Sequence, residues 1–158
     1  MKIIVDTREQ NPFAFQGSRY DGVEVEFGTL GTGDYLLEDL TDRVAVERKS
    51  LDDLIGCLMG SNRERFEREL QRATEFELFR VVVEASWSAL VRGEYQSKMK
   101  PHSACQSVIA LSQRYNVPFD FAWSRVGAEY LCWSFLRHYL ENERKRLKEI
   151  ARAHGGEK

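Results

Sequence analysis

The chain has 158 residues, of which 42% are hydrophobic and 30% charged, and its formal net charge is −2 at pH 7. This length suits one domain, and no apolar run approaches the ~18 residues that a membrane-spanning helix needs. The start of the chain lacks the apolar stretch of a secretory signal, and the three cysteines are far apart without any metal-binding spacing. We therefore predict a single domain over residues 1–158, located in the cytoplasm, with reduced thiols and no membrane contact.

Charge is spread unevenly along the chain. Residues 1–60 carry 6 Lys and Arg against 12 Asp and Glu, whereas residues 61–158 carry 17 against 13. Carboxylates hold divalent cations and basic side chains hold the phosphate backbone of nucleic acids, so this division suits a metal-using phosphodiesterase. Ordinary charge fluctuation in a soluble protein explains it as well, and composition alone does not decide between the two.

Hydrophobic periodicity predicts an alternation of strands and helices in chain order. Short apolar or alternating runs predict strands at 2–5, 23–27, 32–37, 43–49, 78–85 and 117–121. Helical spacing of apolar residues predicts one helix from Ser50, a second over about 63–74, and a third that carries Ala104, Val108 and Leu111. We expect consecutive antiparallel strands in the first third and a central strand at 78–85, because that run is apolar on both faces. The fold class is α/β with a mixed β-sheet flanked by helices.

A long helix is predicted to close the chain over about 127–151. Its apolar side chains cover more than one helical face, including Tyr130, Trp133 and Tyr139. One interpretation is a helix buried between the sheet and its neighbours; the other is that part of this surface meets a second copy, as in a homodimer.

The segment VAVERKS places three charges at the end of an apolar strand. Side chains alternate along a strand, so Glu47 and Lys49 share one face and Arg48 shares the other with Val44 and Val46. A carboxylate and an ammonium side by side can bind a divalent cation and stabilise charge on a phosphate. Asp34, from the preceding strand of a hairpin, and the carbonyl of Arg48 would complete the cation's ligands. The alternative is a charged hairpin edge that keeps the protein soluble.

The residues around this segment resemble the signature of the XPF family of structure-specific DNA endonucleases. The matching elements are Gly33-Asp34, Glu47-Arg48-Lys49 and Asp53, the upstream VDTRE with Asp6, Arg8 and Glu9, and SNRERFE with Arg63. They stand in the family's order, over residues 3 to about 85. The chain carries no helix-hairpin-helix module after them, so it looks like a short stand-alone form.

The resemblance implies a restriction-endonuclease-like core and cleavage of branched or junction DNA with Mg²⁺ or Mn²⁺. By position it makes Asp6, Asp34 and Glu47 the metal ligands and Lys49 their basic partner. Arg48 and Asp53 complete the catalytic set, and Arg8 and Arg63 are expected to contact DNA phosphates. A nucleoid-associated location in a prokaryotic or phage-infected cell would follow.

Several of these residues also have a purely structural explanation. Asp53 could complete a capping box with Ser50, Arg48 could pair with a carboxylate at the edge of the core, and Asp6 and Asp34 could be turn residues. A non-catalytic DNA-binding or partner subunit is the main alternative function, although the Gly-Asp and Glu-Arg-Lys residues that such a subunit tends to lose are present. A restriction-type or mismatch-repair nuclease on a similar core is a third.

Overall fold

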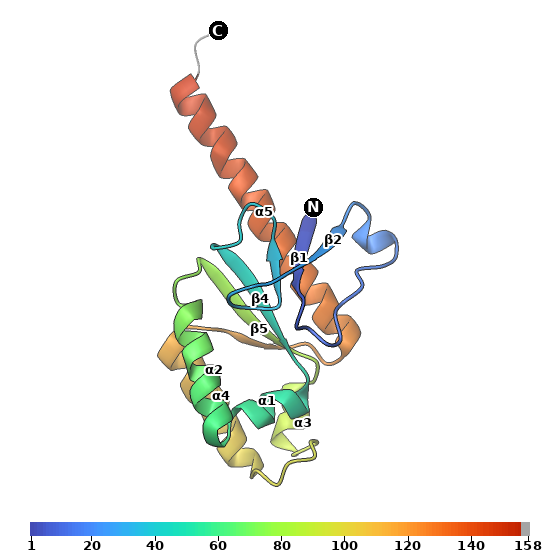
Figure 1. The fold of residues 1–158 in the computed structure, drawn as a ribbon, viewed down its shortest axis with the longest axis vertical. Helices are drawn as coiled ribbons and strands as arrows, with labels where there is room; N and C mark the ends of the chain where they lie inside the picture. Colours follow the sequence, from blue (N-terminus) through green and yellow to red (C-terminus); the bar gives the residue numbers. More distant parts are fainter. Residues whose placement is uncertain (156–158) are drawn as a thin grey trace.

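The computed structural model describes residues 1–155, which form a six-stranded mixed sheet with helices on both faces (Figure 1). The strand order is β2-β1-β3-β4-β5-β6, and β3 alone runs antiparallel to its neighbours. The strands are β1 (Lys2–Asp6), β2 (Glu24–Gly28), β3 (Tyr35–Leu37), β4 (Val44–Lys49), β5 (Leu78–Val83) and β6 (Phe119–Phe121). The carboxyl ends of β1, β4, β5 and β6 therefore meet at one end of the sheet.

Each face of the sheet supports its own core because successive side chains point to opposite faces. On one face, Ala45 and Val81 pack against four helices, α1 (Leu51–Cys57), α2 (Gly60–Ala73), α3 (Trp87–Val91) and α4 (Pro101–Tyr115). On the other, Val46 and Val82 pack against the loop at 7–23 and against α5 (Arg125–Gly155). The 7–23 loop includes a short 3-10 helix, η1 (Ser18–Tyr20). Figure 1 shows α1–α4 gathered away from α5.

The prediction of a mixed α/β sheet flanked by helices is confirmed, but the place of the second strand was predicted wrongly. Rather than joining an antiparallel series, β2 lies parallel to β1 at the edge of the sheet, with Val25 and Phe27 exposed. The long 7–23 loop makes this possible, since two parallel strands need a crossover connection. The apolar strand β5 is covered on both faces as predicted, yet it lies next to the edge strand β6, and β3 and β4 are central.

The last helix is longer than the predicted range 127–151. Its first half packs on the sheet through Ala128, Cys132 and Leu136, which are fully buried, so the interpretation of a buried helix holds for this part. Its second half extends beyond the sheet in Figure 1, with Leu147 and Ile150 exposed. No helix within residues 1–155 is long and apolar enough to cross a membrane.

An aromatic cluster ties the 7–23 loop to the sheet beneath α5. The fully buried ring of Tyr35 stacks on Phe13 at 5.0 Å between centroids and meets Phe15 edge-on. Its hydroxyl oxygen also accepts a hydrogen bond from the buried backbone N–H of Phe13, at 2.9 Å. The Tyr35 side chain thus provides the hydrogen-bond acceptor for a buried N–H of the loop and packs against the loop's aromatic rings.

Replacing Tyr35 by Phe should leave that buried N–H without its acceptor, at a cost of about 1–3 kcal/mol of the free energy of unfolding. Urea unfolding followed by circular dichroism measures it. The matched control is Tyr139→Phe, which removes an exposed hydroxyl that donates to Glu77 and should cost less than about 1 kcal/mol. Equal losses in the two variants would contradict the role given to Tyr35.

Candidate active site

The predicted site residues gather where the carboxyl ends of β1 and β4 meet the beginning of β3. Asp6 ends β1, Asp34 precedes β3, and Glu47 and Lys49 end β4. The β3–β4 register pairs Tyr35 with Val46, which brings Asp34 opposite Glu47. All four side chains belong to the face covered by α1 and α2, because they alternate with residues that pack on the α5 side.

Gly33 positions Asp34. Its φ of +81° lies in the left-handed region that favours glycine, and a Cβ there would come within 2.9 Å of the Ala45 Cβ. The close approach lets the Asp34 N–H donate to the Val46 carbonyl at 3.0 Å, while the Asp34 carbonyl accepts from the Asp6 N–H at 2.8 Å. The side chain then accepts the backbone N–H of Arg48 at 2.8 Å. The Gly-Asp motif thus joins β1, β3 and β4 through hydrogen bonds of the Asp34 backbone and side chain.

Glu47 and Lys49 form a buried ion pair at 2.5 Å, with side chains only 6% and 14% exposed. The Lys49 ammonium also lies 5.4 Å from the centre of the Phe66 ring on α2. Burial raises the pKa of the Glu47 carboxyl well above its usual range; Lys49 opposes this and Asp34 adds to it. Burial is the largest single effect and by itself would lower the pKa of Lys49. The charge and hydrogen bond of Glu47 and the other acidic neighbours together outweigh burial, so the pKa is raised and the amine stays protonated.

Asp34 is the second carboxylate whose ionised form is disfavoured. Burial raises its pKa to about 6, although the Arg48 N–H and the Lys49 charge act in the opposite direction. Two neighbouring carboxylates that resist ionisation are a good donor set for a hard cation, whose charge would favour both ionised forms.

Asp6 differs from the other two carboxylates because its oxygens are already engaged. Both accept from the Arg8 guanidinium, at 2.9 and 2.6 Å, and they also accept the N–H groups of Arg8 and Leu30. The Arg8 guanidinium holds the pKa of Asp6 below its usual value. Within residues 1–155, no group of three His, Cys, Asp or Glu side chains is close enough to hold a metal ion. The structure therefore brings Asp34 and Glu47 together but leaves Asp6 in a pair with Arg8.

Arg48 points to the opposite face, as strand alternation predicts, and lies in a network of carboxylates. Its guanidinium donates twice to Glu9, at 2.9 and 2.7 Å, and pairs with Glu84 at 3.1 Å. Glu84 pairs in turn with Arg125, which donates to the carbonyls of Asn11 and Pro12. This arrangement matches the structural alternative for Arg48. The guanidinium lies on the other face of the sheet from Glu47 and Lys49.

The two remaining predicted residues lie on the neighbouring helices. The Asp53 N–H donates to the Ser50 hydroxyl at 3.1 Å, so Ser50 is the N-cap of α1, as the capping interpretation predicts. Asp53 also lines a cavity with Glu47 and Lys49. Arg63 is half-buried, where it donates to Ser107 of α4 at 3.2 Å and pairs with Glu67 at 3.8 Å.

Sequence reasoning missed three residues of α2 that face the site. Arg65, Glu69 and Arg72 line a cavity of about 230 Å³ together with Asp6, Arg8 and Asp34. A second cavity, of about 290 Å³, continues past Arg8 and Asp34 to Glu47, Lys49 and Asp53. The spacing of four and three residues puts 65, 69 and 72 on one helical face. That pattern was the sequence signal from which a charged face of α2 could have been predicted.

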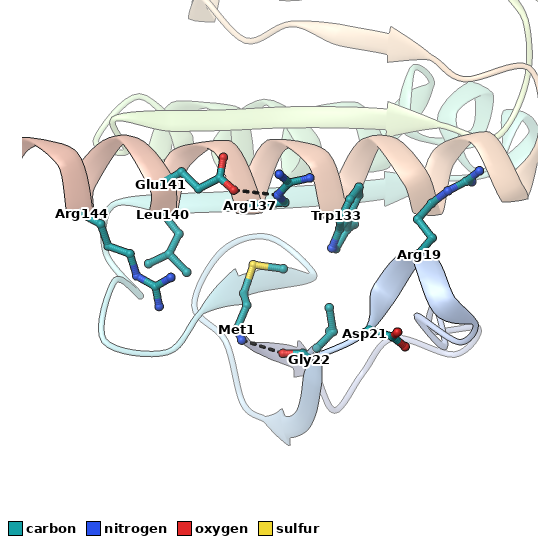
Figure 2. A pocket seen from close by; sticks show the side chains of 10 residues that line it. Met1, Arg19, Asp21, Gly22, Trp133, Arg137, Leu140, Glu141 and Arg144 are labelled. Carbon is teal, nitrogen blue, oxygen red and sulfur yellow. Dashed lines mark hydrogen bonds and ion pairs between the residues drawn. The ribbon is translucent and has the colours of Figure 1, made fainter.

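Another cavity, of about 350 Å³, lies between α5 and the beginning of β1 (Figure 2). Figure 2 shows Trp133, Arg137 and Arg144 on the helix above Met1. Since Met1 precedes β1 and Asp6 ends it, this cavity lies at the other end of the sheet from the predicted residues.

Comparison with known proteins assigns the family. The model of the ERCC4 domain matches residues 5–135, which is most of the chain. The chain belongs to the ERCC4 domain family. This places it among the XPF-type nuclease domains. The Gly33-Asp34 and Glu47-Arg48-Lys49 elements of this chain resemble the motifs of those domains.

Two solved structures share the fold of this ERCC4 domain. XPF from Aeropyrum pernix has a TM-score of 0.68 at 22% identity, over 100% of this chain and 76% of that one. The complex of XPF from the same organism with DNA has a TM-score of 0.67 at 23% identity, over 89% of this chain and 66% of that one. A Methanocaldococcus jannaschii protein described as "Putative ATP-dependent RNA helicase MJ1505" is 27% identical over 121 residues. The match covers 77% of this chain but only 13% of that protein.

The raised pKa of Asp34 predicts how stability varies with pH. Because the folded-state pKa is about 6 rather than 3.8, the contribution of Asp34 to stability is complete below pH ~4 and is lost as the pH rises through ~6. In a chelating buffer, Asp34→Asn should therefore be more stable than the wild type at pH 8, by up to about 3 kcal/mol. The two proteins should converge near pH 4. Thermal unfolding between pH 4 and 8 measures this, and an Asn variant that is less stable at pH 8 would refute it.

Proposed function

We propose that this ERCC4 domain is a divalent-metal-dependent DNA endonuclease. The observation that carries the proposal is the group of Asp34, Glu47 and Lys49 on one sheet face, next to a cavity of about 290 Å³ that the same residues line. A hairpin edge that served only solubility would expose its charges, whereas Glu47 is buried and Asp34 and Lys49 are half-buried.

Asp34 and Glu47 are the proposed ligands of one Mg²⁺ or Mn²⁺, with the Arg48 carbonyl as a third. Both carboxyls have raised pKa values because they are buried close together, and a bound cation would compensate that charge. Asp6 would join them only by exchanging its Arg8 partner for the cation. When bound, such a cation polarises a phosphate oxygen and activates water.

The chain's own residues have separate proposed roles around the scissile phosphate. Lys49 stays protonated, so it can stabilise negative charge on the phosphate or orient the attacking water. Asp53 lines the same cavity and can accept a hydrogen bond from water there. Arg48 acts as a positioning residue: its ion pairs on the far face fix the strand that carries Glu47 and Lys49.

DNA phosphates are proposed to lie along α2 and the end of β1. Arg8 and Arg63 are the contacts that the motifs predict, and Arg65 and Arg72 line the cavity next to Arg8. The XPF complex with DNA supports nucleic acid as the partner, and the motif resemblance supports branched or junction DNA as the preferred form. Incubating the protein with flap, fork, nicked and linear duplex DNA, with and without Mg²⁺ or Mn²⁺, tests both points.

We further propose that residues 1–158 form one domain, located in the cytoplasm with the nucleoid, and that the exposed part of α5 contacts a second copy. Tyr130, an exposed member of the aromatic stripe on that helix, supports the homodimer. A non-catalytic subunit remains the alternative function, and a restriction-type nuclease would instead cut plain duplex at a specific sequence. The presence of Asp34, Glu47 and Lys49 favours the catalytic form.

Glu47→Gln keeps the shape of the side chain but removes the charge that holds the cation. Cleavage of fork DNA should fall about a hundredfold or more, which corresponds to roughly 3 kcal/mol of transition-state energy. Lys49→Met should be comparably inactive. Each variant leaves the other member of the buried ion pair without its partner, so thermal unfolding of both variants must show that they stay folded at the assay temperature. Calorimetric titration with Mn²⁺ should show weakened binding in Glu47→Gln. The control Glu38→Gln changes an exposed carboxylate at the end of β3 and should cut normally. A Glu47→Gln enzyme that cuts at the wild-type rate would falsify the assignment.

Arg63→Ala should weaken DNA affinity across all sequences and lower the slope of log Kd against log salt by about one unit. Arg72→Ala is expected to do the same from the cavity side. Anisotropy titrations at several salt concentrations measure both. Arg137→Ala, on α5 at the other end of the sheet, is the control and should leave the slope unchanged. If Arg63→Ala also leaves it unchanged while the protein loses stability, the arginine only joins α2 to α4.

A further inference from the structure

Trp123 is the most exposed large apolar side chain among residues 1–155. Its side chain is 79% accessible, and its φ is +66°, in the left-handed region that a bulky residue rarely adopts. Burying an indole contributes more than burying most other side chains, so a largely exposed indole on a strained backbone adds little to the stability of the fold. This combination needs an explanation outside the isolated chain.

The turn that carries Trp123 is held rigidly between β6 and α5. The Ser124 N–H donates to the Ala122 carbonyl at 2.7 Å, and the Ser124 hydroxyl accepts the Gly127 N–H at 3.1 Å. A Cβ on Gly127 would come within 2.1 Å of that same Ala122 carbonyl oxygen, so only glycine permits the closure. The backbone of Trp123 is therefore fixed, which lowers the backbone entropy that binding would cost.

Backbone hydrogen bonds connect this turn directly to the catalytic strand. The Lys49 carbonyl accepts the Glu84 N–H at 2.9 Å, and the next carbonyl along, that of Ala85, accepts the Trp123 N–H at 3.1 Å. Lys49, Val83 and Phe121 are also in register on three adjacent strands. With strands ~4.8 Å apart and ~3.3 Å per residue, Trp123 lies within roughly 15 Å of Lys49 at the same end of the sheet.

The residues around Trp123 include groups that can contact a nucleic-acid strand. Arg125 lies two residues beyond Trp123, is 37% exposed, and is tied through Glu84 to Arg48 on the catalytic strand. Trp87, also exposed, packs edge-on against Phe121 beside the turn, at 5.1 Å between ring centroids. Two exposed indoles with an arginine close by in the chain are a composition found on surfaces that hold a backbone and stack unpaired bases.

We propose that Trp123 stacks on an unpaired base of the DNA strand whose phosphate occupies the active site. At ~3.4 Å per stacked nucleotide, the separation corresponds to about four nucleotides or fewer from the scissile bond. The inference rests on the proposed nuclease function and adds to it a device that favours substrates with a single-stranded arm close to the cut. A base inside a duplex does not offer its face, so blunt duplex gains nothing from this residue.

The test compares binding of Trp123→Ala, Trp123→Phe and the wild type to a labelled fork and to blunt duplex, in chelating buffer so that no cleavage occurs. Trp123→Ala should lose about 5- to 100-fold in affinity for the fork, as expected for one lost base–aromatic stack. Trp123→Phe should restore most of the affinity, and none of the variants should change binding to blunt duplex. Val25→Ala, which changes an exposed apolar residue on the edge strand β2, is the matched control.

A fluorescent base analogue moved along the single-stranded arm adds a direct readout. Its emission should be quenched at one position close to the cleavage site in the wild type and not in Trp123→Ala. Equal affinity of Trp123→Ala and the wild type for the fork, or an equal loss on fork and blunt duplex, overturns the proposal. So does a variant that changes only the sedimentation mass, since Trp123 would then contact a second copy. If the wild type cuts DNA while these results fail, the stacking inference is wrong and the nuclease assignment stands; if the wild type neither binds nor cuts DNA, both fail.

Discussion

Asp34 joins three strands at the end of the sheet where the candidate chemistry lies. Its carbonyl accepts from β1, its N–H donates to β4, and its carboxylate accepts the next N–H of β4, that of Arg48. These bonds fix the register that sets Asp34 opposite Glu47. Because a shift of one residue would turn every side chain of β4 to the other face, the position of Glu47 and Lys49 depends on this junction. Gly33 is required for the same reason, since any side chain there would push β3 away from Ala45.

The alternation of β4 divides the Glu-Arg-Lys motif between two environments. Glu47 and Lys49 face α2 and the cavities, whereas Arg48 faces α5 and is enclosed by Glu9 and Glu84. A buried ion pair of this kind adds little net stability, but removing one partner leaves an uncompensated charge. Arg48 thereby fixes the position of β4, because the strand cannot move without separating Arg48 from Glu9 on the 7–23 loop and from Glu84, which follows β5.

Local patterns predicted the strands and the longer helices, while long-range packing decided how the strands pair and which side chains meet. The α2 residues Phe66 and Leu70 are buried as their spacing predicts, and Asp34 lies beside Glu47 as a hairpin requires. The parallel pairing of β2 with β1 could not be read from its alternation, because the pattern is the same in either direction. The engagement of Asp6 by Arg8 depends on a turn that no periodicity describes. Glu69 carried a helical signal, but only the sheet beneath α2 shows which helical face meets the site.

The opposing demands of folding and chemistry explain why the charges are arranged in this way. Ionised Asp34 and Glu47 repel each other in a buried place, so the fold alone is strained as the pH rises. Lys49 offsets part of that repulsion, and a divalent cation would offset the remainder. The cation would bind two carboxylates that burial has already partly desolvated. The same desolvation that lowers the stability of the metal-free protein therefore strengthens every electrostatic contact made to a phosphate there. A site built on solvated carboxylates would avoid the cost in stability, but water would weaken its hold on both the cation and the DNA.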